Sequence, residues 1–148
     1  MSESERFKVY AAAYLILENG GDILLSRRYQ TGYQDGNYSL VSGHFDGGET
    51  AKECIIREAR EEAGLELKPE DLEIVHVMHR LSSDREYFDV YLRAKKWTGK
   101  IINQEPDKCD DLKWFELNYL PNNMVPEVRF VLEQVNKKIY FSEFGWPN

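Results

Sequence analysis

The sequence predicts an α/β domain in which strands and helices intermix along the chain. Residues 51–63 and 125–136 carry apolar side chains at helical spacing, and segments before and between them have the β-branched and aromatic content of strands. The 148 residues are 42% hydrophobic, which is enough for a core of their own. We therefore expect a layered α/β fold in a single domain that spans residues 1–148.

Six strands are expected, and turn signals separate two pairs of them. A turn of Asn19, Gly20, Gly21 and Asp22 lies between the first two strands, which predicts a hairpin. Residues 82–84 form a similar turn later in the chain. The expected strands cover residues 7–17, 23–28, 38–41, 73–81, 86–97 and 112–117. Polar loops are expected at residues 29–37 and 98–111.

The first helix has clear start and stop signals. Thr50 and Glu53 have the spacing of a capping box, in which each residue satisfies a backbone N–H group of the other. Gly64 fits the position just past the helix end, where a left-handed backbone is common. These signals predict a helix with well-defined ends between Thr50 and Gly64.

This helix carries three glutamates, Glu58, Glu61 and Glu62, on one face. Like charges at spacings of three or four destabilise a helix by about 0.2–0.5 kcal/mol per pair. A divalent cation reverses that sign, and Mg²⁺ in particular binds carboxylate oxygens together with substrate phosphates. The face is therefore either a metal site for phosphate chemistry or an ordinary solvated acidic surface.

Composition narrows the range of partners. The formal charge of −7 argues against binding of a nucleic acid polymer, which requires a basic surface, but a bound metal ion allows a nucleotide substrate. No segment approaches the length of a membrane span, and the first six residues lack the apolar run of a signal peptide. Two cysteines do not make a disulfide framework. We expect a cytoplasmic protein without membrane contact.

The spacing of residues around the helix favours the metal site. The segment from Gly43 to Leu65 resembles the signature of the Nudix hydrolases, which reads Gly, five residues, Glu, seven residues, Arg-Glu, an apolar residue, one residue, Glu-Glu, one residue, Gly and an apolar residue. Every specified place is filled, by Gly43, Glu49, Arg57, Glu58, Ala59, Glu61, Glu62, Gly64 and Leu65. With residue usage of roughly 7% at seven fixed positions, chance agreement is on the order of 10⁻⁸ per window.

The resemblance implies the Nudix fold, an α/β/α sandwich with a central mixed β-sheet. It also implies a Mg²⁺ cofactor, with Mn²⁺ as an alternative. The metal ligands that it implies here are the backbone carbonyl of Ser42 and the carboxylates of Glu58, Glu61, Glu62 and Glu105. Among the catalytic residues, Arg57 would pair with Glu49 and orient the glutamates. Glu58 is our choice of general base, with Glu61, Glu62 and Glu105 as alternatives.

Outside this segment the chain most resembles the MutT-like nucleoside triphosphate pyrophosphohydrolases. Trp97-Thr-Gly-Lys, followed by Asn103-Gln-Glu105-Pro and Trp114, is similar to a MutT stretch in which a glutamate reaches the metal cluster. This similarity selects Glu105 as the additional ligand or base. The alternative is an ordinary loop carboxylate.

Five residues are candidates for substrate binding. Similar enzymes place an arginine at the position of Arg28 for substrate phosphates, and Gly43 and His44 lie where the backbone and a ring can approach phosphate. Ser39 stands where some relatives read the base with an asparagine, and Glu127 falls in a segment that resembles the base-recognition segment of MutT-type enzymes. Structural alternatives are an exposed strand-end arginine for Arg28 and a helix-dipole contact for Glu127.

The expected reaction is Mg²⁺-dependent hydrolysis of a nucleoside diphosphate linked to another moiety. The favoured substrate is a nucleoside triphosphate, including oxidised or noncanonical ones, which would yield the monophosphate and pyrophosphate. Other Nudix substrates, such as ADP-ribose or dihydroneopterin triphosphate, are alternatives. A second class of function is a Nudix module that binds a nucleotide without turnover. The protein is expected to act on a small nucleotide as a monomer or a homodimer.

Overall fold

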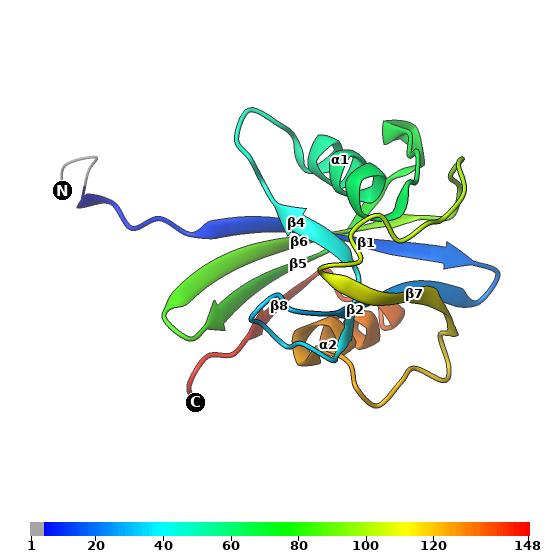
Figure 1. The fold of residues 1–148 in the computed structure, drawn as a ribbon. Helices are drawn as coiled ribbons and strands as arrows, with labels where there is room; N and C mark the ends of the chain where they lie inside the picture. Colours follow the sequence, from blue (N-terminus) through cyan, green and yellow to red (C-terminus); the bar gives the residue numbers. More distant parts are fainter. Residues whose placement is uncertain (1–4) are drawn as a thin grey trace.

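The computed structural model describes residues 5–148. The first four residues of the predicted domain, which belong to the segment without the apolar run of a signal peptide, lie outside the described part. Strands and helices intermix as expected (Figure 1). In chain order the elements are β1 (Tyr10–Asn19), β2 (Asp22–Arg28), β3 (Tyr38–Ser39), β4 (Val41–His44), α1 (Ala51–Ala63), η2 (Pro69–Asp71), β5 (Glu73–Ser82), β6 (Arg85–Ala94), β7 (Cys109–Glu116), α2 (Pro126–Asn136) and β8 (Phe141–Phe144). No helix among residues 5–148 has the length and apolar character needed to cross a membrane.

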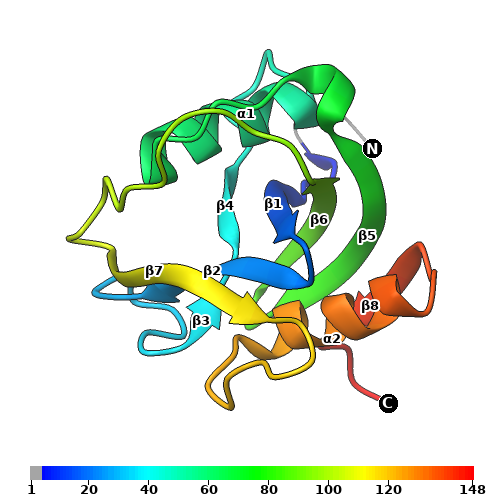
Figure 2. The same ribbon diagram turned by 90° about the vertical axis from the view of Figure 1, so that its right-hand side faces the viewer.

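The strands form one mixed sheet around β1. The main strand order is β3-β2-β1-β6-β5-β8, with β4 paired to β1 and β7 paired to β2. The β1–β6 and β5–β8 pairs are parallel, and the remaining pairs are antiparallel. Helices α1 and α2 lie on opposite sides of this sheet (Figures 1 and 2). The expected α/β/α sandwich with a mixed sheet is therefore confirmed.

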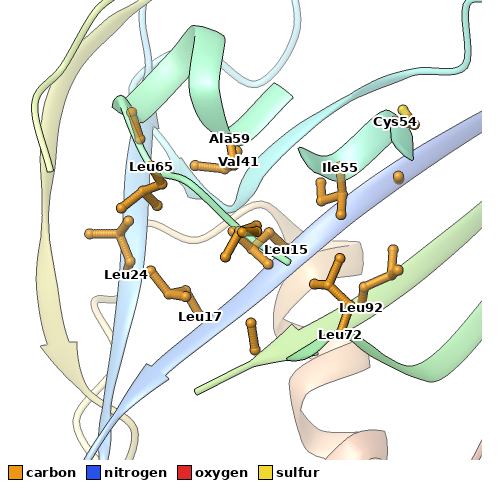
Figure 3. Packing of buried hydrophobic residues seen from close by; sticks show 14 residues of the cluster. Leu15, Leu17, Leu24, Val41, Cys54, Ile55, Ala59, Leu65, Leu72 and Leu92 are labelled. Atoms are coloured by element: carbon orange, nitrogen blue, oxygen red, sulfur yellow. The ribbon is translucent and has the colours of Figure 1, made fainter. Parts of the chain in front are cut away.

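Alternation along β1 divides the core into two clusters, as expected for a strand covered on both faces. Ala13, Leu15 and Leu17 pack on the α1 side, together with Ile55 and Ala59 of the helix (Figure 3). Ile16, between two of them, points to the other side, where the buried residues of α2 lie: Val128, Val131 and Leu132. The helix that carries the glutamates is thus held to the sheet by its apolar stripe.

The ends of α1 match their predicted signals. The Thr50 side chain accepts a hydrogen bond from the N–H of Glu53, and the Glu53 carboxylate accepts one from the N–H of Thr50. Gly64 has φ of 70°, and its N–H bonds to the last carbonyl groups of the helix. These caps stabilise both ends of α1, the helix that carries the acidic face.

Replacing Gly64 by alanine is expected to lower the free energy of unfolding by about 1–2 kcal/mol, because a left-handed backbone is costly for any residue with a Cβ atom. The new Cβ would also lie 2.8 Å from Nε2 of Gln104. Gly20→Ala is the matched control, because Gly20 has φ of 61° but open space around it. Urea unfolding should show a larger loss in the free energy of unfolding for Gly64→Ala than for Gly20→Ala. Equal losses would mean that the Gln104 contact contributes nothing.

Four sequence expectations are corrected by the structure. The strand expected at residues 38–41 is interrupted at Leu40, and its two parts pair with different partners, β2 and β1. Cys109 is buried at the start of β7 and not in a polar loop, because β7 follows β2 through a bulge as far as Arg28. A strand that was not expected, β8, pairs with the edge of β5. The first strand also lies later than expected, at Tyr10–Asn19.

Candidate active site

The acidic face of α1 borders a cavity of about 810 Å³. Glu58, Glu61 and Glu62 line it together with Ser42 and Gly43 of β4, the strand that packs beside the helix. An added Cβ at Gly43 would lie only 2.2 Å from Cδ of Glu58. A side chain at this position would therefore displace the Glu58 carboxylate from its place beside the strand.

Arg57 connects the loop before the helix to the acidic face. Its Nη2 and Nε donate to the two carboxylate oxygens of Glu49 at 2.8 and 3.2 Å. Its Nη1 donates to Glu58 at 2.6 Å and to Glu61 at 3.4 Å. The hydrogen bond from Arg57 is the main cause that lowers the pKa of Glu49 to about 2. The predicted Arg57–Glu49 pair is present, and Arg57 holds Glu58 in a fixed direction.

Glu62 is the carboxylate with the least favourable surroundings. Burial and the neighbouring carboxylates of Glu58 and Glu105 raise its pKa well above the usual range of a glutamate. The N–H of Ser42 donates to it at 3.3 Å. The carboxylates of Glu58, Glu62 and Glu105 therefore influence one another in the cavity wall. Ser42, which directly precedes the first glycine of the motif, lies beside Glu62.

Glu105 reaches this part of the cavity wall because its loop is bound to the end of α1. The N–H of Ile102 donates to the carbonyl of Ala63, and the N–H of Gln104 donates to the carbonyl of Glu62. Burial, aided by the charges of Glu58 and Glu61, raises the pKa of Glu105 although Lys108 opposes the shift. The structure thus brings a residue more than 40 positions from the helix to the acidic face.

The donor set fits a hard divalent cation. Glu58, Glu62 and Glu105 offer carboxylate oxygens, and the mutual repulsion that raises the pKa of Glu62 is relieved by a positive ion. Among residues 5–148, no group of three or more His, Cys, Asp or Glu side chains already stands in a ligating arrangement. Cation binding therefore requires side chains to move. Glu58 would then divide its two oxygens between the cation and Arg57.

The five predicted substrate-binding residues line this same cavity: Arg28, Ser39, Gly43, His44 and Glu127. Glu127 is only 4% exposed and lies in the first turn of α2, a position that also suits the alternative of a helix-dipole contact. The hydroxyl of Tyr33 donates to Glu127 at 2.6 Å, so the loop between β2 and β3 closes onto α2 here. Arg28 donates through Nε to the carbonyl of Tyr33 at 2.6 Å and therefore shapes that loop.

The structure adds a group of cavity residues that sequence reasoning missed. Arg80 and Asp89 form a buried ion pair at 2.6 Å, and Arg80 also lines the cavity. The Arg80 guanidinium lies 4.1 Å from the ring centre of Tyr87. The sequence contains only a weak signal for this pair. Arg80 and Asp89 are charged residues within two predicted strands, on the face that also carries His76 and Tyr91. Pairing across β5 and β6 is what brings these charges together.

A family model described as the NUDIX domain matches residues 7–135. The chain belongs to the Nudix family. Similar curated proteins include the NAD-capped RNA hydrolases NudC of Pseudomonas putida, 31% identical over 116 residues, and of Pseudomonas aeruginosa, 32% identical over 111 residues. The alignments cover 77% and 72% of this chain but only 39% and 36% of those relatives. The chain therefore spans about two fifths of the length of the relatives that it matches.

Solved structures of Nudix proteins have the same fold. A MutT NUDIX hydrolase from Burkholderia pseudomallei is 25% identical and superposes with a TM-score of 0.81 over 87% of this chain and 99% of its own. The NUDIX domain of NrtR from Shewanella oneidensis, solved with ADP ribose, has a TM-score of 0.74 over 93% of both chains. At 15% identity this second likeness concerns the fold alone.

These likenesses confirm the predicted family and fold class. The chain thus combines the Nudix fold with the complete signature of the family. Divalent metal ions are the general cofactors of this family. The roles of the individual residues, the identity of the ion and the oligomeric state stay predictions.

Proposed function

We propose that this protein hydrolyses the diphosphate bond of a nucleoside diphosphate derivative, using Mg²⁺ or Mn²⁺ held by Glu58, Glu61, Glu62 and Glu105 together with the carbonyl of Ser42. The observation that carries the proposal is that Glu58, Glu62 and Glu105 line one cavity together with Arg28 and Arg80, and that the charges of Glu58 and Glu105 act on Glu62. Carboxylates that repel one another beside basic residues suit a substrate that brings both phosphate and a divalent ion.

The bound cation would neutralise charge on the phosphates and make a water molecule more acidic. Glu58 is the residue that accepts the proton of the attacking water, and the Arg57 hydrogen bond at 2.6 Å keeps its carboxylate directed into the cavity. Glu49 in turn holds Arg57 through two hydrogen bonds. Arg28 binds phosphate oxygens, and Ser39 and Glu127, which line the same cavity, contact the nucleoside.

Two substrate classes suit this chemistry. A nucleoside triphosphate, including oxidised or noncanonical forms, is favoured by the MutT-like loop that carries Glu105 and by the likeness to a MutT NUDIX hydrolase. A diphosphate that joins a nucleoside to a second group is favoured by the NAD-capped RNA hydrolases among the relatives. In both cases we propose that the substrate is a small molecule and that the protein acts in the cytoplasm.

A substrate panel tests the proposed function. Purified protein with Mg²⁺ should hydrolyse at least one member of a panel of nucleoside triphosphates, ADP-ribose, NAD⁺ and dihydroneopterin triphosphate. The product would be a nucleoside monophosphate, or dihydroneopterin monophosphate from the last, and chelation of the metal should abolish its release. Glu62→Gln is the control for contaminating activity, because it removes a proposed ligand. If wild-type protein releases no more product than Glu62→Gln from any member while still binding nucleotide, the protein is a binding module instead of an enzyme.

A further inference from the structure

Three aromatic rings from three strands meet at one end of the cavity. Tyr10 of β1 stacks on Tyr87 of β6 with ring centroids 5.3 Å apart. The His44 ring of β4 lies 5.8 Å from Tyr87 and 6.1 Å from Tyr10. The sheet dictates this meeting, because β1 pairs Tyr10 with Tyr87 on one side and Ala12 with His44 on the other.

Two guanidinium groups complete this cluster. Arg80 covers Tyr87 at 4.1 Å and is neutralised by its buried pair with Asp89. Arg85 lies 5.1 Å from the ring centre of Tyr10, and unlike Arg80 it is exposed. His44 is exposed as well, and both His44 and Arg85 line the cavity. In the aromatic platform, defined as His44, Tyr87, Arg85 and the supporting Tyr10, the exposed flat groups that an incoming molecule can reach are His44 and Arg85.

The acidic face and the exposed residues of the platform line the same cavity. All residues from Ser39 to His44 line it, and Ser42 and Gly43 precede His44 directly along β4. Ser42 and Gly43 are the residues beside Glu62 and Glu58. A diphosphate held at the acidic face therefore lies in the cavity that His44 and Arg85 also line.

We propose that the platform binds a second ring, so that the preferred substrates are diphosphates with an aromatic group at both ends. Flat heterocycles stack on aromatic faces and on guanidinium planes, which is the surface that His44 and Arg85 provide. A nucleoside triphosphate or ADP-ribose leaves this surface without a stacking partner. The inference rests on the proposed function, because the diphosphate must lie at the acidic face.

NAD⁺ and ADP-ribose are suitable probes, because they differ only by the nicotinamide ring. We expect wild-type protein to prefer NAD⁺ in kcat/KM, and Arg85→Ala or His44→Ala to reduce that preference roughly tenfold, as loss of one stacking contact does. His44→Phe keeps a flat face and should retain the preference. Arg93→Ala is the matched control, because Arg93 lies on the same strand but pairs with Glu73 away from the platform.

Dissociation constants for both probes, measured on Glu58→Gln protein that turns over slowly, separate binding from hydrolysis. Equal kcat/KM and equal affinity for the two probes in wild type would overturn the platform, and so would a preference that survives both alanine variants. Full restoration by Arg85→Lys would also overturn it, because lysine keeps the charge but not the plane. Arg85-dependent binding of NAD⁺ without any hydrolysis by wild type would support the platform and reject the proposed function.

Discussion

Glu58→Gln is expected to lower kcat by about 10²–10⁴-fold, the usual contribution of a general base. Glutamine has almost the same shape, but it cannot accept a proton from water and binds a divalent ion poorly. The effect should appear in kcat for every substrate, because Glu58 acts on the diphosphate that all of them share. Steady-state kinetics with saturating Mg²⁺ provide the measurement.

Glu66→Gln is the control for this change, because Glu66 lies just beyond the same helix and pairs with Arg60 on an exposed surface. It should leave kcat unchanged. Thermal unfolding of both variants should remain close to that of wild type, which excludes misfolding as the cause. A Glu58→Gln protein that retains wild-type kcat would assign the base to another carboxylate, with Glu61, Glu62 and Glu105 as the next candidates.

Arg57→Ala is expected to have the second largest effect, a loss of about 10²-fold in kcat, because a displacement of a catalytic group by about 1 Å has consequences of that size. The side chain binds Glu49, Glu58 and Glu61 at once, so its removal leaves the proposed base without a fixed direction. KM should change much less than kcat, since Arg57 acts through Glu58 and does not touch the substrate.

Arg57→Lys distinguishes orientation from charge. Lysine keeps the positive charge but cannot donate to Glu49 through two nitrogens while also reaching Glu58, so only a small part of the activity should return. Arg60→Ala is the matched control, because Arg60 lies on the same helix and pairs only with the exposed Glu66. Full activity of Arg57→Lys would show that the pairing geometry is unimportant.

The acidic face could be predicted from the sequence because its determinants are local. The capping box at Thr50, the stop at Gly64 and the helical spacing of Glu58 and Glu62 all lie within one short segment, and the structure contains each of them. Helix geometry converts such spacings directly into a shared face. The pair of Arg57 with Glu49 was implied by the resemblance to the family, and the structure contains it.

Other parts depend on contacts between distant segments. The four-residue strand β8 has no pattern of its own and forms because β5 offers an open edge, where His76 lies within hydrogen-bond distance of the Ile139 carbonyl and the Ser142 hydroxyl. The sequence also did not determine how exposed Glu127 is, because its burial depends on Tyr33 from a distant loop. Neither contact leaves a periodic signal in the chain.

The sequence alone determined the acidic face on which the proposed diphosphate chemistry depends, because one capped helix carries Glu58, Glu61, Glu62 and Arg57. The tertiary structure decided what surrounds that diphosphate. It brings Glu105 to the helix through backbone hydrogen bonds, buries Arg80 against Asp89, and places His44 beside Tyr87 by the pairing of three strands. Such neighbours follow from strand register and loop closure, which depend on the whole fold and not on any one segment.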